Sequence, residues 1–247
     1  MSAFDFADAE RGLAGTIRGP ATALLFDHED VLAASPSAEV ELGEGNGDGS
    51  GSARARLDGV SLEVELAPLG QRVGLRTDAL GAEELQVCRV LGELGRGGDR
   101  DELACLGIRY SGTPAPDFSR LALVRSIAIA FGDGGLLALR AARPREAQGH
   151  GDEEVSAVVC DPEAGIAEID EVLLSTQYDE AGRQVRANLE MWEAGDGPGA
   201  PLRAAGAIVC GTSLALGEQR LNLAFFRWSM GGRPGLGRYE VLAGPDA

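Results

Sequence analysis

The chain has 247 residues, which is enough for one large all-β domain or for two halves. Its 39 acidic residues outnumber 22 basic residues, all of them arginine, and the resulting net charge of −17 argues against nucleic acid and anionic membranes as partners. Residues 1–10 are acidic and unlike a signal peptide, and no window approaches the roughly 18 apolar residues of a spanning helix. We therefore expect a cytoplasmic protein without membrane insertion.

The first half of the chain contains short strand candidates that are separated by polar turns. The dipeptide Asp58-Gly59 joins two of them and is a strong signal for a two-residue hairpin turn. Residues 61–66 then alternate between polar and apolar side chains, so every second residue is expected on the inner face. The strand candidates of this half are residues 13–18, 21–26, 31–34, 38–42, 53–57 and 60–66.

Residues 79–93 fit helical spacing about as well as strand spacing, and we interpret them as a short helix or linker between two halves. Residues 101–110 return to strand character, and two prolines make residues 111–117 an extended connection. The predicted organisation is an N-terminal β half at 1–78, a linker with a candidate short helix and a strand at 79–119, and a C-terminal β half at 120–247.

The second half contains three segments with the same hairpin pattern. Residues 121–140, 166–192 and 221–242 each read as two apolar strands around a turn that contains glycine. Antiparallel hairpins in series build barrels or sandwiches, and a barrel of this size can hold a small ligand. The expected fold class is all-β, with two sequential antiparallel barrel or sheet halves and a short helix or linker between them.

Three stretches of sequence carry a family resemblance. They are FDFADAERGL at residues 4–13, AIAFGDG at 128–134 and RWSMGGRPGLGRYE at 227–240. Together they resemble the two-domain lipocalin-like proteins related to carotenoid 1,2-hydratase and AttH. The resemblance implies two lipocalin-like halves, a lipophilic substrate such as an isoprenoid, and redox-neutral addition of water to a double bond. Such chemistry needs an acid in an apolar cavity, where burial keeps a carboxyl group protonated.

One segment departs from that family pattern. Relatives usually carry Arg-Asp-x-Ser-Trp-Gly after the central linker, where this chain has GIRYSG at residues 107–112. Arg109 matches the pattern, but Tyr110 takes the approximate place of the acid, and the tryptophan is missing. The departure argues against catalysis of the family type and leaves ligand binding open.

Two residues are candidates for acid–base chemistry if the protein is an enzyme. Asp133 would be a general acid at a barrel rim, and His150, between two glycines of a loop, would carry a proton. The alternatives are an Asp133 that binds neighbouring backbone N–H groups in its turn and a His150 that is merely solvated. His28 and His150 are far apart without clustered cysteines, so we expect no metal site, and no sequence motif indicates a cofactor.

Five further residues are predicted to contact a ligand. Arg125 interrupts the apolar stretch 121–131, and strand alternation allows it to face inward, where it needs an anionic partner, or outward. Trp228 is either a pocket wall or part of the core, and if it faces inward then so does Phe226, with Arg227 outward. The expected ligand contacts are Arg109, Tyr110, Arg125, Tyr178 and Trp228.

The four cysteines are widely separated in the sequence. Apolar neighbours indicate buried strand positions, so free structural thiols are expected, and a disulfide stays open until the geometry is known. The four are Cys88, Cys105, Cys160 and Cys210.

The leading functional hypothesis is binding of a lipophilic small molecule, isoprenoid-like or steroid-like, in a cavity lined by the inward faces of the second-half strands. The first alternative is a redox-neutral hydratase, isomerase or cyclase acting on such a molecule. The second alternative is a non-catalytic interaction scaffold. The sequence leaves open which applies, and it does not determine the oligomeric state.

Overall fold

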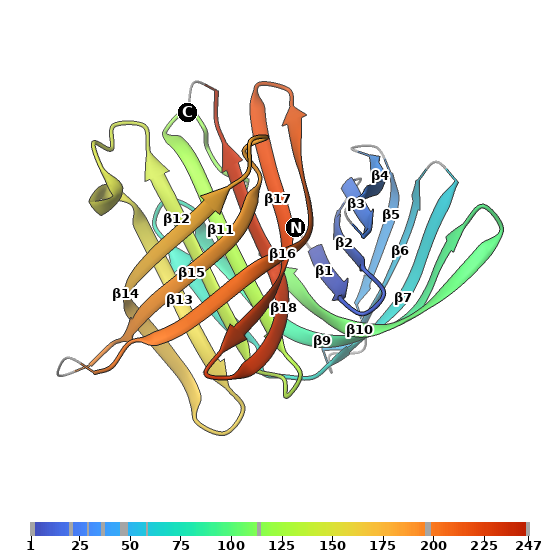
Figure 1. Cartoon of the computed structure of the whole chain (residues 1–247), viewed down its shortest axis with the longest axis horizontal. Helices are drawn as coiled ribbons and strands as arrows, with labels where there is room; N and C mark the ends of the chain where they lie inside the picture. Colours follow the sequence, from blue (N-terminus) through green and yellow to red (C-terminus); the bar gives the residue numbers. More distant parts are fainter. Residues whose placement is uncertain are drawn as a thin grey trace.

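The computed structural model describes residues 3–19, 22–28, 30–35, 38–44, 49–57, 59–112, 115–195 and 199–245. In this part of the chain the regular structure is β-strand throughout, apart from the short 3-10 helix η1 (His150–Asp152). The strands form two bodies that lie side by side, an open curved sheet and a closed barrel (Figure 1). The expectation of an all-β protein with two sequential halves is therefore confirmed.

The first body is an antiparallel sheet that curls around its own core without closing. Its strand order is β4-β3-β2-β1-β10-β9-β7-β6-β5, and β8 also pairs with β9. Residues from the concave face, such as Phe4, Phe6 and Val90, form one hydrophobic cluster. The strands are β1 (Ala3–Asp8), β2 (Leu13–Arg18), β3 (Thr22–Asp27), β4 (Asp30–Ser35), β5 (Glu39–Glu44), β6 (Gly51–Leu57), β7 (Val60–Pro68), β8 (Val73–Thr77), β9 (Gly81–Arg96) and β10 (Asp99–Ser111).

The alternation expected after the Asp58-Gly59 turn is present in β7. Leu62, Val64 and Leu66 are buried on one face, and the residues between them are exposed. Asp58 lies outside the described residues, and β6 and β7 on either side of it pair as an antiparallel hairpin.

Residues 79–93 do not form the helix that was one of the two expected alternatives. They lie largely in β9, which pairs along its length with β10 and also with β7 and β8. Helical and strand periods fit this stretch almost equally, so pairing with partners distant in the sequence decides between them. Both β9 and β10 belong to the first sheet. The residue limits given for the halves stay a prediction.

The second body is a closed barrel in which each strand pairs with the next along the chain. The last strand pairs with the first, with Tyr239 opposite Ile127, and this pairing closes the barrel. The strands are β11 (Leu121–Phe131), β12 (Leu136–Pro144), β13 (Glu154–Asp161), β14 (Gly165–Tyr178), β15 (Gln184–Glu193), β16 (Leu202–Leu216), β17 (Gln219–Met230) and β18 (Arg233–Ala243).

Large aromatic side chains pack in the interior of the barrel. The Trp228 and Phe226 rings stack with centroids 5.3 Å apart, and Phe226 also contacts the ring of Tyr239. Trp228 fits because its Cα partners on both neighbouring strands are glycines, Gly206 and Gly235. Both Phe226 and Trp228 belong to the barrel core, so the expectation that they face inward together is confirmed.

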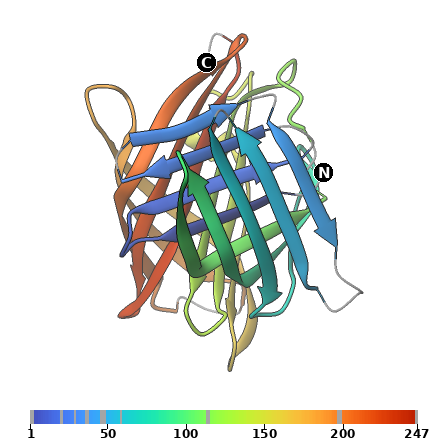
Figure 2. The ribbon, with the colours of Figure 1, turned by 90° about the vertical axis from the view of Figure 1, so that its right-hand side faces the viewer.

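The two bodies pack through the convex face of the sheet and the outer wall of the barrel (Figure 2). In β1, Phe4 and Phe6 belong to the core of the sheet, whereas Ala3 and Ala7 contact clusters that include barrel residues. Strand alternation thus places Asp5, which lies between the two phenylalanines, on the side of the barrel. The centre of the molecule is therefore a sheet-on-sheet junction.

No helix in the described residues combines the length and the apolar character needed to cross a membrane.

Candidate functional site

A groove of about 860 Å³ runs between the first sheet and one end of the barrel. Apolar side chains from both bodies form much of its lining, with Ala7 and Leu106 from the sheet and Leu236 from the barrel. The remaining lining residues are Asp8, Ala9, Glu10, Arg11, Leu69, Arg89, Ala104, Cys105, Gly132, Arg227, Pro234 and Gly235. The groove is thus apolar with charged groups around it, and it exists because the two bodies meet along part of their surfaces.

The inner end of the groove leads toward buried charges. A small cavity of about 10 Å³ shares Ala7, Leu106 and Leu236 with the groove and also contacts Asp5 and Arg238. A space of this size holds at most about one water molecule. A ligand in the groove would therefore lie close to the buried charges without touching them in this conformation.

Six charged side chains meet at the junction between the sheet and the barrel. Arg238 of β18 lies at the centre, with its Nε 3.2 Å from Oδ2 of Asp5 and its Nη1 3.4 Å from Oε2 of Glu240. Arg18 of β2 also pairs with Glu240. Beside them, Nε of Arg140 lies 3.4 Å from Oε2 of Glu83. Three carboxylates and three guanidinium groups balance one another, as burial of charge requires. These residues are called the junction cluster: Asp5, Arg18, Glu83, Arg140, Arg238 and Glu240.

The pKa values of the cluster follow from burial and pairing. Burial acts to raise the pKa of Glu240, but Arg18 and Arg238 outweigh it, and the pKa lies below its ordinary value. Burial acts to lower the pKa of Arg238, but Asp5, Tyr110 and Glu240 raise it well above its ordinary value. Both groups therefore stay charged at neutral pH, and the cluster is ionic rather than a proton store.

Tyr110 is buried beside this cluster. The guanidinium carbon of Arg238 lies 4.8 Å from the centre of the Tyr110 ring, which is a cation–π contact. Burial, with a contribution from Asp5, raises the pKa of Tyr110 well above its ordinary value, so its hydroxyl stays protonated. The Tyr110 hydroxyl, Thr16 Oγ1 and the carboxylate oxygens of Asp5 make no hydrogen bond of normal geometry within the described part of the chain. Buried polar atoms that lack a hydrogen-bond partner in the protein usually bind an ordered water molecule.

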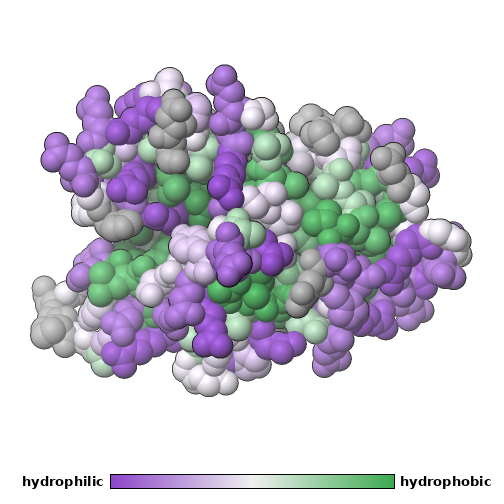
Figure 3. Space-filling view, turned by 45° about the horizontal axis from the view of Figure 1, so that its top comes forward, coloured by the Kyte–Doolittle hydropathy of each residue, from purple (hydrophilic) through white to green (hydrophobic). Residues whose placement is uncertain are grey.

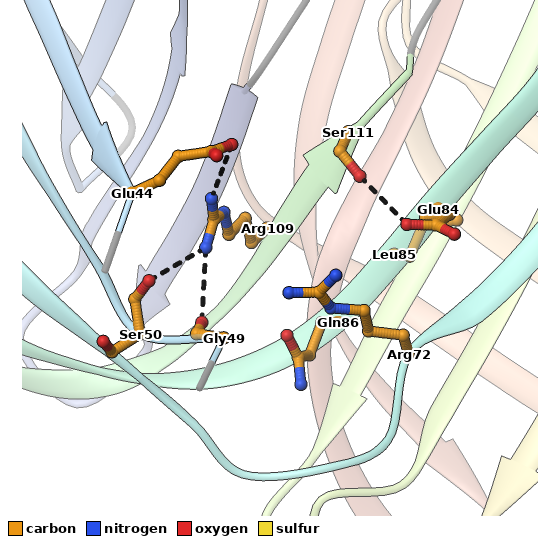
Figure 4. A pocket seen from close by; sticks show the side chains of 9 residues that line it. All are labelled: Glu44, Gly49, Ser50, Arg72, Glu84, Leu85, Gln86, Arg109 and Ser111. Carbon is orange, nitrogen blue, oxygen red and sulfur yellow. Dashed lines mark hydrogen bonds and ion pairs between the residues drawn. The ribbon is translucent and has the colours of Figure 1, made fainter. Parts of the chain in front are cut away.

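Arg109, next to Tyr110 in the sequence, points to the opposite face of the sheet. It lies in a pocket of about 250 Å³ and donates hydrogen bonds to the carbonyl oxygens of Gly49 and Ser50 and to Oε1 of Glu44 (Figure 4). Arg72 lines the same pocket, together with Glu84 and Gln86. Arginines and glutamates are matched in number in this pocket, so we assign no ligand to it. Its lining residues are Glu44, Gly49, Ser50, Arg72, Glu84, Leu85, Gln86, Arg109 and Ser111.

Asp133 lies in the turn between β11 and β12 and is held by an ion pair. Its Oδ1 accepts a hydrogen bond from the Gly135 N–H, and its Oδ2 lies 2.5 Å from Nη2 of Arg233. Burial acts to raise the pKa of Asp133, but the Gly135 N–H and Arg233 outweigh it and lower the pKa. The carboxylate is therefore charged at neutral pH, which is unfavourable for a general acid. The role of Asp133 as an acid stays a prediction.

Three other predicted residues lie in or at the barrel. Arg125 shares the inward side of β11 with Ile127 and pairs with Glu153, and Tyr178 is half exposed at the end of β14. Trp228 is fully buried in the barrel core. His150 begins η1, and its side chain lies outside what the structure describes. The structure therefore places Arg125 and Tyr178 near Tyr239 in the barrel, with Trp228 in the same core, and leaves Arg109, Tyr110 and Asp133 outside the barrel interior. The proposed roles of all these residues stay predictions.

The cysteines are free thiols. Cys105 lines the groove, and burial raises the pKa of its thiol to about 12. Burial also raises the pKa values of Cys88 and Cys210 to about 12. The described residues contain no group of three or more histidine, cysteine, aspartate and glutamate side chains arranged to hold a metal ion.

The sequence reading did not identify the junction cluster, although a signal was present. Asp5 stands between Phe4 and Phe6, and Arg140 stands between apolar residues of β12. A charge inside an apolar strand predicts a buried partner. The partners lie far away in the sequence, however, and only the packing of sheet on barrel reveals them.

The chain was compared with known proteins. No protein-family model matches it, and no curated sequence is detectably related to it. Solved structures do match. An AttH-like protein from Nitrosomonas europaea has a TM-score of 0.66 at 13% identity, over 98% of this chain and 91% of its own. Kievitone hydratase from Nectria haematococca has a TM-score of 0.60 at 9% identity, over 100% and 89% of the two chains.

A third structure, CghA, has a TM-score of 0.55 at 12% identity and covers 100% of this chain and 88% of its own. At identities this low the likeness concerns the fold alone. It confirms that the whole chain has the two-body architecture of the AttH-like protein, as the sequence resemblance implied.

Proposed function

We propose that this chain, which shares its fold with the AttH-like protein and kievitone hydratase, binds a lipophilic small molecule in the groove between sheet and barrel. The observation that carries the proposal is the groove itself, with a volume of about 860 Å³ and lining side chains such as Leu69, Leu106 and Leu236. Pockets for small organic ligands usually measure about 300–1,000 Å³ and are lined mainly by apolar groups. This size and lining suit a lipophilic molecule.

The groove is a better candidate than the interior of the barrel. Trp228, Phe226 and Tyr239 occupy that interior with the rest of the barrel core. A ligand there would have to displace well-packed aromatic rings, whereas the groove requires no such rearrangement. We therefore shift the expected binding place from the barrel interior to the junction of the two bodies.

We favour ligand binding over a hydratase reaction as the function of the groove. The name of kievitone hydratase describes that protein, and a hydratase reaction here would need a protonated acid that faces the ligand. The carboxylic acids among the described groove residues are Asp8 and Glu10, and both lie at the open β1–β2 turn. Asp5 lies deeper, paired with Arg238 and behind a cavity of about 10 Å³. Hydratase activity thus remains the alternative.

A matched pair of tryptophan variants tests the proposal. Ala104 is exposed and lines the groove, so Ala104→Trp should fill the groove without disturbing a core. Ala82 is also exposed and lies on β9 outside the groove, and it gives the control Ala82→Trp. We expect the fluorescent neutral polyene methyl parinarate to bind the native protein and the Ala82→Trp variant. Its affinity for Ala104→Trp should fall about tenfold, as expected for the loss of about 1.4 kcal/mol.

Two results would contradict the proposal. One is the absence of any fluorescence gain with the native protein. The other is an equal affinity of the two tryptophan variants for the polyene while both keep the native circular dichroism spectrum. An activity assay with an unsaturated substrate in water would separately test the hydratase alternative.

A further inference from the structure

We infer that the molecule bound in the groove is a lipophilic anion, with an apolar body on the groove floor and one carboxylate or phosphate head group held by Arg89 and Arg227. The inference rests on the proposed function, because it concerns the same groove. It specifies the chemical class of the ligand.

Arg89 is placed on the groove side by the register of three neighbouring strands. On adjacent strands, Arg89 of β9 lies opposite Leu106 of β10, and Leu106 lies opposite Ala7 of β1. Directly opposed residues of antiparallel strands point to the same face, and neighbouring strands are about 4.8 Å apart. Arg89 therefore continues the row formed by Ala7 and Leu106, which are part of the apolar floor.

The charge of Arg89 is not used by the protein itself. Its side chain is exposed, and it makes no ion pair or hydrogen bond with another described residue. In contrast, Arg54, Arg100 and Arg203 are also exposed, but each pairs with a glutamate on a neighbouring strand. Arg89 thus lines the groove without an anionic partner.

Arg227 approaches the groove from the barrel. Its position on β17 is exposed, and Nη2 donates a hydrogen bond to the carbonyl oxygen of Ala9 at 3.4 Å. That bond uses one of five N–H donors, and its acceptor is uncharged. The other donors remain available to a ligand, so arginines from both bodies face one groove.

The acidic residues of the groove do not cancel these charges. Asp8 Oδ1 accepts hydrogen bonds from the backbone N–H groups of Glu10 and Arg11, and Oδ2 lies 3.9 Å from Nε of Arg11. Asp8 and Arg11 are therefore engaged with each other and with their own turn. Glu10 is exposed in that turn, and Arg89 and Arg227 leave an excess of positive charge.

A lipophilic anion suits this combination better than a neutral lipophile. The planar guanidinium group binds a carboxylate or phosphate through two parallel hydrogen bonds, and such charge-assisted bonds are stronger than neutral ones. An apolar body seated on the groove floor would shield the head group from water on that side and strengthen the attraction. Figure 3 shows one face of the molecule, on which apolar residues form separate green patches among purple hydrophilic ones.

The test compares cis-parinaric acid with its methyl ester, because the two differ only in the charge of the head group. We expect the native protein to bind the acid at least about tenfold more tightly than the ester, the change expected from one charge-assisted hydrogen bond. In Arg89→Gln, and more strongly in Arg89→Gln with Arg227→Gln, the affinity for the acid should fall to that of the ester. The affinity for the ester should stay within about twofold.

Arg186→Gln provides the matched control. Arg186 is exposed on β15, lies outside the groove and has no ion pair with the described residues, so its replacement changes the net charge equally. We expect no change in the affinity for either probe. A fall equal to that in Arg89→Gln would overturn the inference, because the net charge rather than the groove would then control binding.

The outcomes separate this inference from the proposed function. Equal binding of acid and ester by the native protein would overturn the anionic head group while supporting a lipophile in the groove. Binding of neither probe would overturn the proposed function. Competition by lauric acid and by dodecyl phosphate, which share a chain length, identifies the head group, and failure of both to displace parinaric acid would count against the inference.

Discussion

Arg238 is a charged residue that is buried on all sides in the middle of the molecule. Asp5 and Glu240 accompany it, and Tyr110 covers one face of its guanidinium group. Removing such charges from water is costly, and their mutual attraction offsets the cost only when every charge keeps its partner. The junction cluster is therefore sensitive to the loss of any one member, in contrast to the exposed ion pairs of the strands.

Replacing Glu240 by glutamine tests this sensitivity. The Glu240→Gln change leaves Arg18 and Arg238 without one shared anion, so we expect the free energy of unfolding to fall by about 3–5 kcal/mol. Glu190→Gln is the control, because its pair with Arg203 is exposed and should contribute at most about 1 kcal/mol. Urea denaturation followed by circular dichroism measures both. Equal losses in the two variants would show that burial does not set the cost.

At the scale of the strand, the barrel depends on small residues placed opposite large ones. Gly206 of β16 lies across from Trp228 of β17, and a Cβ atom at Gly206 would lie 2.6 Å from the indole ring. Because the ring is surrounded by other core side chains, it has little room to move. The missing side chain of Gly206 on β16 thus leaves the space in the core that the Trp228 indole occupies.

The variant Gly206→Ala should destabilise the protein by about 1–3 kcal/mol, the usual cost of overpacking a core. Gly74→Ala on β8 is the matched control, since a Cβ atom there would meet no atom within 4 Å. The double variant with Trp228→Phe should recover part of the loss, because the smaller ring frees space. Thermal unfolding of the native protein, Gly206→Ala, Trp228→Phe and the double variant measures the coupling, and an equal effect of Gly206→Ala with either residue at position 228 would rule out contact with the indole as the cause.

At the scale of the whole molecule, the junction couples the sheet to the barrel. Leu85 and Tyr110 of the sheet and Ala138 of the barrel share one hydrophobic cluster there. The junction cluster lies within the same interface and joins strands from both bodies. Unfolding of either body would expose these groups, so the stability of the whole chain should respond to the ionisation of the cluster.

This coupling predicts a dependence of stability on pH. The pKa of Glu240 is lower in the folded protein than its ordinary value of 4.5. Its charge therefore stabilises the fold above about pH 4.5, and this contribution is lost as the pH falls through the lower, folded pKa. The difference in unfolding free energy between the native protein and Glu240→Gln should shrink between about pH 5 and pH 3. Urea titrations at several pH values measure it, and a constant difference would contradict the assignment.

The sequence was sufficient for the fold class and much of the strand pattern. Leu62, Val64 and Leu66 alternate with polar residues because one face of β7 is buried, and that pattern is local. The prediction of a short helix or linker at residues 79–93 was wrong, because the pairing of β9 with β7, β8 and β10 involves distant residues.

The candidate site was much less accessible from the sequence. Tyr110 and Arg109 were both predicted, but they are adjacent in a strand and so point to opposite faces of the sheet. Arg89, Arg227 and Leu236 come from distant parts of the chain and line one groove only because sheet and barrel pack together.

By itself, the sequence determined the all-β class, the turns with glycine and the fact that Phe226 and Trp228 share one face of their strand, because these depend on neighbours along one strand. Only the tertiary structure decided that the first body stays open, that the barrel closes between β11 and β18, and that the charges of Asp5 and Arg238 meet. Those outcomes depend on which surfaces come together in space. The sequence pattern of a strand predicts on which face of the strand a residue lies. It does not predict which other part of the protein packs against that face.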